Sequence, residues 1–154
     1  MPSEAGVQSV LFIGALTMHH HRLLWAMLIG VFLLAPTVTI AGGDLRLGGS
    51  LVGRIENDGS IRVGGSVVGK FESNGDIRIK GTVVGKIESN GDIRKKGSVV
   101  GSVESNGDVR VGGSVKGRIE SNGSVRKGGS VIGSARGVKP ERAAAIFFFE
   151  FIEL

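Results

Sequence analysis

The sequence contains no cysteine, no tyrosine, one tryptophan and three prolines among 154 residues. Without cysteine there is no disulfide framework and no thiolate chemistry. The three histidines are His19, His20 and His21, so the chain beyond them has no Ser-His pair and no histidine-rich zinc site. Aromatic stacking residues are scarce and basic residues alternate with acidic ones, which argues against nucleic-acid binding. We therefore expect no bound metal, no cofactor and no nucleic-acid partner.

Carboxylates do occur in pairs, and such pairs can cleave glycosides. The same pair recurs in every repeat of this chain, however, whereas an active site should be singular. We therefore predict that the protein is not an enzyme and has no small-molecule substrate.

The first 41 residues are predicted to be a leader. Leu23 to Ala35 are thirteen residues without a charge, preceded by Arg22 and followed by small residues up to Ala41. This order is typical of a secretory signal peptide, whose apolar helix is shorter than the roughly 20 residues of a membrane span. Apolar residues 10–17 add length upstream, so an uncleaved membrane anchor is the alternative. Met18 is a candidate start, which would make residues 1–17 a mis-assigned extension.

Glycine is abundant, at 27 residues, and it recurs with a period of 16 residues. Columns of glycine begin at Gly43, Gly49 and Gly53 and continue without insertion or deletion as far as Arg136. Each glycine opens a Gly-x-aliphatic-x unit. Self-similarity at a fixed period indicates a solenoid or another repeat array.

Branched aliphatic residues with alternating polar neighbours favour strands over helices. One repeat buries about three aliphatic side chains, each worth about 1.5–3 kcal/mol, whereas ordering each residue costs about 1–2 kcal/mol in backbone entropy. A single repeat is therefore unstable and must pack on its neighbours. We predict an all-β fold, a parallel β-solenoid (β-helix) with 16-residue rungs. It has five full and two partial repeats over residues 43–136, preceded by an apolar leader helix.

An antiparallel meander is the rival fold, because Ser-Asn-Gly-Asp is also a strong hairpin signal. A two-residue turn would set Ile87 opposite Arg94 and mix the core face with the solvent face. A three-residue loop pairs Ile87 with Ile93 instead, but it sets Lys86 against Arg94. Facing like charges weaken a sheet, so the solenoid is preferred.

In the solenoid, the aliphatic position of each unit points inward and stacks on the same position of the next rung. The predicted core and stacking residues are Val67, Phe71, Ile77, Val83, Ile87, Ile93, Val99, Val103, Val109, Val115, Ile119 and Val125.

The run GSVVGKFESNGDIRI, from Gly65 to Ile79, and its copies resemble the bactofilin family of bacterial polymer-forming cytoskeletal proteins. The resemblance covers residues 43–136. It implies a right-handed, three-sided β-helix that joins end to end with other copies into nucleotide-free filaments, often at the membrane. The functional positions that the resemblance implies are inward aliphatic residues and terminal hydrophobic residues, and none of them is catalytic. The leader is a departure, because bactofilins generally lack a cleavable export signal.

Residues 137–154 form a hydrophobic C-terminal segment. Pro140 and Glu141 can open a short helix, whereas the residues from Ile146 to Ile152 have the composition of a final strand. The segment either caps the last rung or presents a sticky surface for assembly, since its phenylalanines are too many to face one interior. The assembly candidates are Phe147, Phe148, Phe149 and Phe151.

Two functions remain open. The first is a self-assembling scaffold at the bacterial cell envelope, with other copies and the membrane or envelope as partners. The second is a secreted or surface β-helix that binds through its charged faces, as an adhesin or matrix component does. We expect the protein to be exported or membrane-anchored, with the cytoplasmic face of the inner membrane as the alternative.

Overall fold

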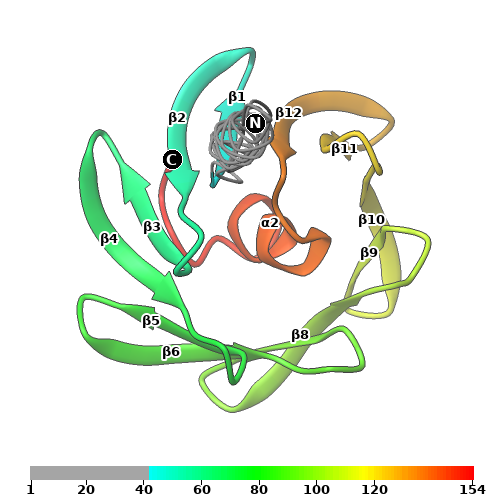
Figure 1. Ribbon diagram of the computed structural model, residues 1–154. Helices are drawn as coiled ribbons and strands as arrows, with labels where there is room; N and C mark the ends of the chain where they lie inside the picture. The colour runs from blue at the N-terminus through cyan, green and yellow to red at the C-terminus, as the bar shows by residue number, and fades with distance from the viewer. Residues whose placement is uncertain (1–41) are drawn as a thin grey trace, which may run out of the picture. The chain divides into compact units, whose positions relative to one another are not determined.

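In the computed structural model, residues 42–154 are described, and twelve antiparallel strands close into a barrel around a short helix (Figure 1). Each strand pairs with its neighbours in sequence, and the first strand pairs with the last. The elements are β1 (Gly43–Leu47), β2 (Ser50–Ile55), β3 (Ser60–Val63), β4 (Ser66–Phe71), β5 (Asp76–Ile79), β6 (Thr82–Ile87), β7 (Asp92–Lys95), β8 (Ser98–Val103), β9 (Asp108–Val111), β10 (Ser114–Ile119), β11 (Ser124–Lys127), β12 (Ser130–Arg136) and α2 (Pro140–Phe147). The all-β prediction is confirmed, whereas the leader lies outside the described residues.

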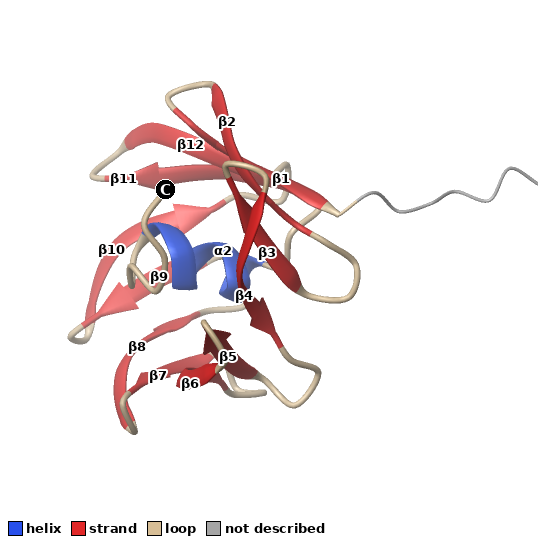
Figure 2. Ribbon diagram, turned by 90° about the vertical axis from the view of Figure 1, so that its left-hand side faces the viewer, coloured by secondary structure: helices blue, strands red, loops and turns tan. Residues whose placement is uncertain are grey.

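The connections alternate between two ends of the barrel. The turn end carries the turns at residues 48–49, 64–65, 80–81, 96–97, 112–113 and 128–129. The loop end carries the loops at residues 56–59, 72–75, 88–91, 104–107 and 120–123. β1 begins and β12 ends at the loop end, so α2 enters the barrel there, as Figure 2 shows.

The predicted parallel solenoid is wrong, and so is the three-sided β-helix that the resemblance implied. Every neighbouring pair of strands is antiparallel, and Ile87 lies opposite Ile93 as in the rival meander. Lys86 does face Arg94. However, Arg94 binds Glu88 and Lys86 lies near Asp76, so each cation has its own carboxylate. The like-charge objection to the meander therefore fails, because the charges are neutralised laterally.

Local turn chemistry explains the hairpins. At the loop end the glycine that closes each loop adopts a positive φ, +90° at Gly91, and the Asn90 side chain accepts a hydrogen bond from the Asp92 amide. At the turn end both residues have positive φ, for example +56° at Gly64 and +84° at Gly65. Two such residues make the turn that matches the twist of antiparallel strands.

Four of the twelve predicted stacking positions point outward. Phe71, Ile77, Ile93, Val103, Val109, Ile119 and Val125 are buried, and Ile87 packs partly buried against them. Val67, Val83, Val99 and Val115 are exposed. The reason is a bulge in every turn-end hairpin: Ile61 faces Gly69, but Arg62 faces Val67, which leaves Val68 as an extra residue. The extra residue reverses the alternation, so Val68 turns inward and Val67 outward.

α2 begins with Pro140 at its first position and carries Glu141 in its first turn, as the helical alternative for the C-terminal segment predicted. The predicted final strand is absent from the described chain, since residues 146 and 147 belong to α2. Five consecutive helix residues, from Ala143 to Phe147, are buried. A small helix with alanine on several sides fits inside the barrel, where bulkier side chains would clash with the strands.

Candidate functional site

The interior of the barrel is filled by α2 and the residues that follow it, here called the plug (residues 140–154). The phenylalanines of the plug lie over the glycine column that begins at Gly53, and successive rings contact glycines one repeat apart. A Cβ atom placed on Gly101 would lie 2.6 Å from Phe149 Cζ, and one on Gly117 would lie 2.6 Å from Phe148 Cζ. The same relationship joins Phe147 to Gly133 and Phe151 to Gly85. Each glycine therefore provides the space that an aromatic ring fills.

The four phenylalanines predicted as assembly candidates are buried, each with 9 % or less of its surface exposed. The expectation that they could not share one interior is wrong, because successive rings spread over successive repeats of the barrel wall. They are consequently not available as an adhesive surface in this conformation. Their position agrees with the capping alternative, although they cover the inside of the barrel and not an open rung.

Lys95 fixes the end of the plug. Its side chain occupies the position that Ile79 and Val111 hold in other repeats, and its Nζ donates hydrogen bonds to the carbonyl oxygens of Phe149 and Glu150, at 2.9 and 3.2 Å. The same ammonium lies 5.0 Å from the centre of the Phe151 ring. A cation at the carboxyl end of a helix interacts favourably with the helix dipole. Sequence reasoning missed Lys95, although a lysine at an aliphatic position of a strict repeat is a visible signal.

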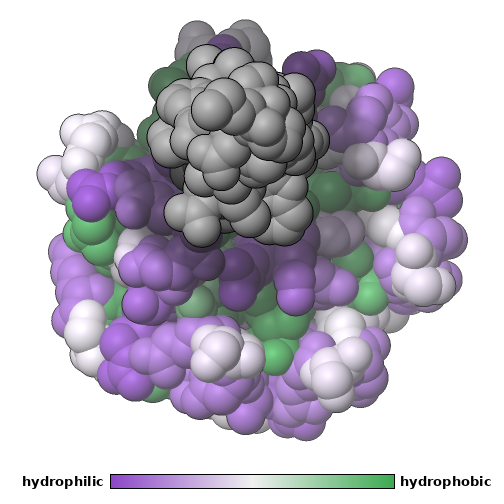
Figure 3. Space-filling model, viewed as in Figure 1, coloured by the Kyte–Doolittle hydropathy of each residue, from purple (hydrophilic) through white to green (hydrophobic). Residues whose placement is uncertain are grey.

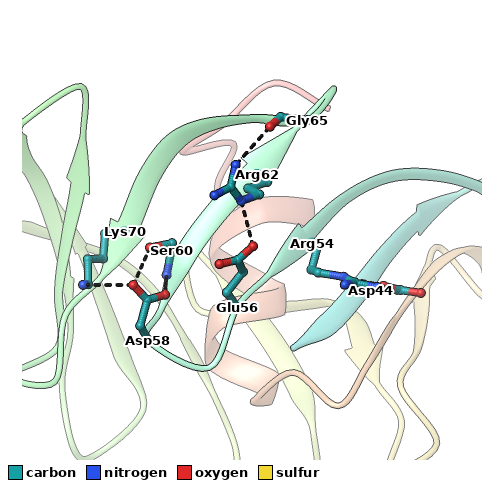
Figure 4. Close-up of polar contacts among 8 residues, drawn as sticks. All are labelled: Asp44, Arg54, Glu56, Asp58, Ser60, Arg62, Gly65 and Lys70. Carbon is teal, nitrogen blue, oxygen red and sulfur yellow. Dashed lines mark hydrogen bonds and ion pairs between the residues drawn. The ribbon is translucent and has the colours of Figure 1, made fainter. Parts of the chain in front are cut away.

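A ladder of arginines and glutamates runs along the outer wall. In each case an arginine on one strand bridges the preceding loop and the following turn. Arg62 Nε donates to Glu56 at 2.7 Å, and Arg62 Nη1 donates to the carbonyl oxygen of Gly65 at 3.1 Å (Figure 4). The pattern recurs at Arg78, Arg94, Arg110 and Arg126. Since these side chains remain partly solvated, each pair adds only about 0–1 kcal/mol.

Two aspartates at the loop end have depressed pKa values. The Ser60 amide, with help from the Ser60 hydroxyl and Lys70, lowers the pKa of Asp58 to about 2 (Figure 4). The Arg118 guanidinium, 2.7 Å away, is the main cause of the lowered pKa of Asp108. Both carboxylates are consequently ionised at any physiological pH.

Ion pairs neutralise most of the acidic residues at the loop end, and the face that Figure 3 shows is predominantly hydrophilic. The five loop glutamates pair with the arginines of the ladder. Four aspartates pair with cations of nearby strands, namely Asp44 with Arg54, Asp58 with Lys70, Asp76 with Lys86 and Asp108 with Arg118.

Acidic and basic residues alternate on the outer wall and are not separated between the two ends of the barrel. Arg62 lies directly opposite Arg54, and Arg78 lies directly opposite Lys70, so cations of successive strands lie side by side along the wall. The ladder arginines pair with glutamates of the loops, which keeps opposite charges next to each other in space.

A belt of exposed aliphatic side chains encircles the outer wall near the turn end. Its members are between 41 and 55 % exposed, and all but Leu47 occupy the same position in successive repeats. The belt consists of Leu47, Leu51, Val67, Val83, Val99, Val115 and Val131. Beside Val83 lies an outer groove of about 470 Å³, and an equivalent groove of about 230 Å³ lies beside Val67. Repeated apolar exposure of this kind is typical of a surface that contacts another molecule.

Within residues 42–154, no cluster of three metal-ligating side chains is present, and no helix there is long and apolar enough to cross a membrane.

Comparison with known proteins gives one family. The family model described as bactofilin, polymer-forming cytoskeletal, matches residues 60–139, which is more than half of the 154-residue chain. The matched segment extends from the start of β3 to the residue before α2. No curated protein and no solved structure matches the chain significantly.

Proposed function

Because the chain belongs to the bactofilin family of polymer-forming cytoskeletal proteins, we propose that it is a non-catalytic scaffold that assembles with copies of itself, end to end, into a polymer. The family match over residues 60–139 is the observation that carries this proposal. The match supports a structural, polymer-forming role and speaks against an enzymatic one.

The closed barrel limits how copies can associate. A sheet edge offers unpaired backbone groups to another chain. Here β1 is paired on both sides, with β2 and with β12, so the described sheet has no free edge. The interior is occupied by the plug. Assembly must therefore use side chains on the outer wall or at the two ends.

Electron microscopy and sedimentation of the purified full-length chain test the proposal. The scaffold function predicts regular filaments, formed without nucleotide, that sediment above a critical concentration. Discrete particles at every concentration would favour the alternative, a secreted or surface binding module that uses its charged faces.

We also propose that the protein is exported or membrane-anchored at the cell envelope. The uncharged segment from Leu23 to Ala35, which lies outside the described residues, supports this location. N-terminal sequencing of the mature protein tests it. A first residue at Gly42 supports cleavage and export, an intact leader in the membrane fraction supports an anchor, and recovery of the intact chain in the cytosolic fraction contradicts both.

A further inference from the structure

Four loops at the loop end carry an Asn-Gly pair that the scaffold function does not use. Each of the four asparagines is exposed. Such a pair is open to deamidation, because glycine has no side chain to keep its amide nitrogen away from the carboxamide of the preceding asparagine. The pairs are Asn74-Gly75, Asn90-Gly91, Asn106-Gly107 and Asn122-Gly123.

In three of these loops both ends of the carboxamide are held by the aspartate that follows the glycine. Asn106 Oδ1 accepts a hydrogen bond from the Asp108 amide at 2.9 Å, and Asn106 Nδ2 donates one to Asp108 Oδ2, also at 2.9 Å. A carboxamide clamped in this way cannot turn toward the backbone without losing a hydrogen bond to a charged acceptor. The same two bonds join Asn74 to Asp76 and Asn90 to Asp92.

The fourth loop has Ser124 in place of the aspartate. The Ser124 amide donates to Asn122 Oδ1 at 2.8 Å, but Asn122 Nδ2 has no hydrogen-bond acceptor among residues 42–154. The backbone of this loop is held as firmly as that of the Asn106 loop, since the Gly123 and Gly107 amides each donate at 2.8 Å to the glutamate carbonyl oxygen that begins their loop. The two loops therefore differ in the hold on the asparagine side chain.

We propose that Asn122 is a site of spontaneous deamidation in the folded protein, whereas the other three asparagines are protected by their aspartate clamps. The Gly123 nitrogen loses its proton and forms a bond to Asn122 Cγ. The bond from Cγ to Nδ2 then breaks, and the nitrogen takes up a proton and leaves as ammonia. Water, the only co-reactant, opens the succinimide ring at either carbonyl and gives aspartate or isoaspartate at position 122.

The barrel already contains the aspartate form of this loop. Asp58 occupies the position of Asn122 in an earlier repeat, and Ser60 occupies that of Ser124. The two carboxylate oxygens of Asp58 accept hydrogen bonds from the Ser60 amide and the Ser60 hydroxyl, each at 2.8 Å. An aspartate at position 122 can make the same two bonds with Ser124, so the aspartate product fits the loop.

The test measures deamidation at each site by peptide mass spectrometry. The purified full-length chain is incubated below its melting temperature in mildly alkaline buffer made with heavy-oxygen water. The new carboxyl group takes its oxygen from water, so the label identifies asparagines that react during the incubation. We expect Asn122 to react at least about fivefold faster than Asn106, because its side chain lacks one hydrogen bond to a charged acceptor.

Reciprocal variants move the clamp from one loop to another. Ser124→Asp should supply the missing acceptor and slow the reaction of Asn122 at least about fivefold, and Asp92→Ser should speed the reaction of Asn90 by a similar factor. Asp92 is the matched choice, since it forms no ion pair within residues 42–154, whereas the aspartates of the other two clamped loops do. The repeats themselves exchange serine and aspartate at this position, so both variants are compatible with the fold.

Unfolding in urea supplies the control for local sequence. All four sites have the same Glu-Ser-Asn-Gly sequence, so we expect their rates in urea to agree within about twofold once the clamps are lost. Equal rates at the four sites of the folded chain would overturn the proposal, and so would rates that neither substitution changes. A faster reaction of Asn122 that persists in urea would also overturn it, because the fold would then not be the cause.

Discussion

Phe149 fills the space that a side chain on Gly101 would occupy, since its Cζ atom lies 2.6 Å from the position of a Cβ atom on that glycine. Because neighbouring rings repeat the relationship on neighbouring repeats, the plug and the barrel wall are complementary over four repeats of the chain. The plug is therefore part of the core of the fold and not an appendage.

Phe149→Ala should lower the free energy of unfolding by about 3–5 kcal/mol, because it removes a buried ring and leaves a cavity against Gly101. Val99→Ala is the matched control, since Val99 is 47 % exposed, and it should cost about 0.5 kcal/mol or less. Urea denaturation followed by circular dichroism measures both. Similar losses in the two variants would contradict the burial of the plug.

Gly101→Ala should destabilise the barrel by about 3 kcal/mol, because its Cβ atom meets the Phe149 ring and the carbonyl oxygen of Arg110, which belongs to the neighbouring strand. Gly112→Lys tests whether any change of glycine is harmful. Gly112 has a φ of +57° and open space around it, and Lys96 occupies the equivalent turn position with a φ of +50°. We expect this second variant to lose about 1 kcal/mol, the lower end of the cost of a left-handed backbone at a residue other than glycine, measured in the same denaturation experiment.

Lys95→Met should loosen the end of the plug while keeping the apolar stem of the side chain. The loss of hydrogen bonds from a charged donor to the carbonyl oxygens of Phe149 and Glu150 should cost about 1.5–3 kcal/mol. Hydrogen exchange should show faster exchange of the amides of residues 149–151, whereas Lys96→Met, at the exposed neighbouring position, should not change them. Unchanged protection in Lys95→Met would show that the lysine does not hold the plug.

Acid should destabilise the wild type through Asp58. Its pKa is lowered to about 2 in the folded protein, chiefly by the Ser60 amide, from the ordinary aspartate value of 3.8. A depressed carboxyl pKa stabilises the fold above pH 4, and this contribution is lost as the pH falls from about 4 to about 2. Asp58→Asn should therefore lose stability at neutral pH and show a shallower decline between those two pH values. An equally steep decline in thermal melts of the two proteins would show that Asp58 is not a source of the acid sensitivity.

Sequence alone predicted much of the local structure. The 16-residue period, the absence of helix over residues 43–136 and the inward orientation of Ile77, Ile93 and Val109 all follow from glycine spacing and aliphatic alternation. The direction of the strands does not follow from that pattern. The period shows which residues are equivalent. It is 16 residues whether each repeat forms one rung of a parallel solenoid or one antiparallel hairpin.

Two features of the sequence did carry the missing information. The Gly-Gly turns, such as Gly64 and Gly65, are a hairpin signal that complements the Asn-Gly loops. The consecutive pair Val67-Val68 breaks strict alternation and marks the bulge. The fit of the plug, in contrast, depends on closure of the barrel, since only the three-dimensional path brings glycines far apart in sequence around one interior.

Pairing of β1 with β12 closes the barrel and places Arg46 opposite Ser134. The absence of cysteine makes the test clean, because Arg46→Cys/Ser134→Cys introduces the only two thiols. In the barrel, directly opposite residues have Cβ atoms about 4.5–5.5 Å apart, whereas the ends of a stacked solenoid of this length would be about 25 Å apart at 4.8 Å per rung. Ser98→Cys/Ser114→Cys is the converse pair. Its residues are one repeat apart, so they would be adjacent in a solenoid but are two strands apart in the barrel.

Mild oxidation of the monomeric variants, followed by non-reducing electrophoresis and mass spectrometry, measures which pair forms an intramolecular disulfide. The closed barrel predicts a disulfide between positions 46 and 134 and none between positions 98 and 114. A disulfide between positions 98 and 114, with free thiols at positions 46 and 134, would contradict the closed antiparallel barrel.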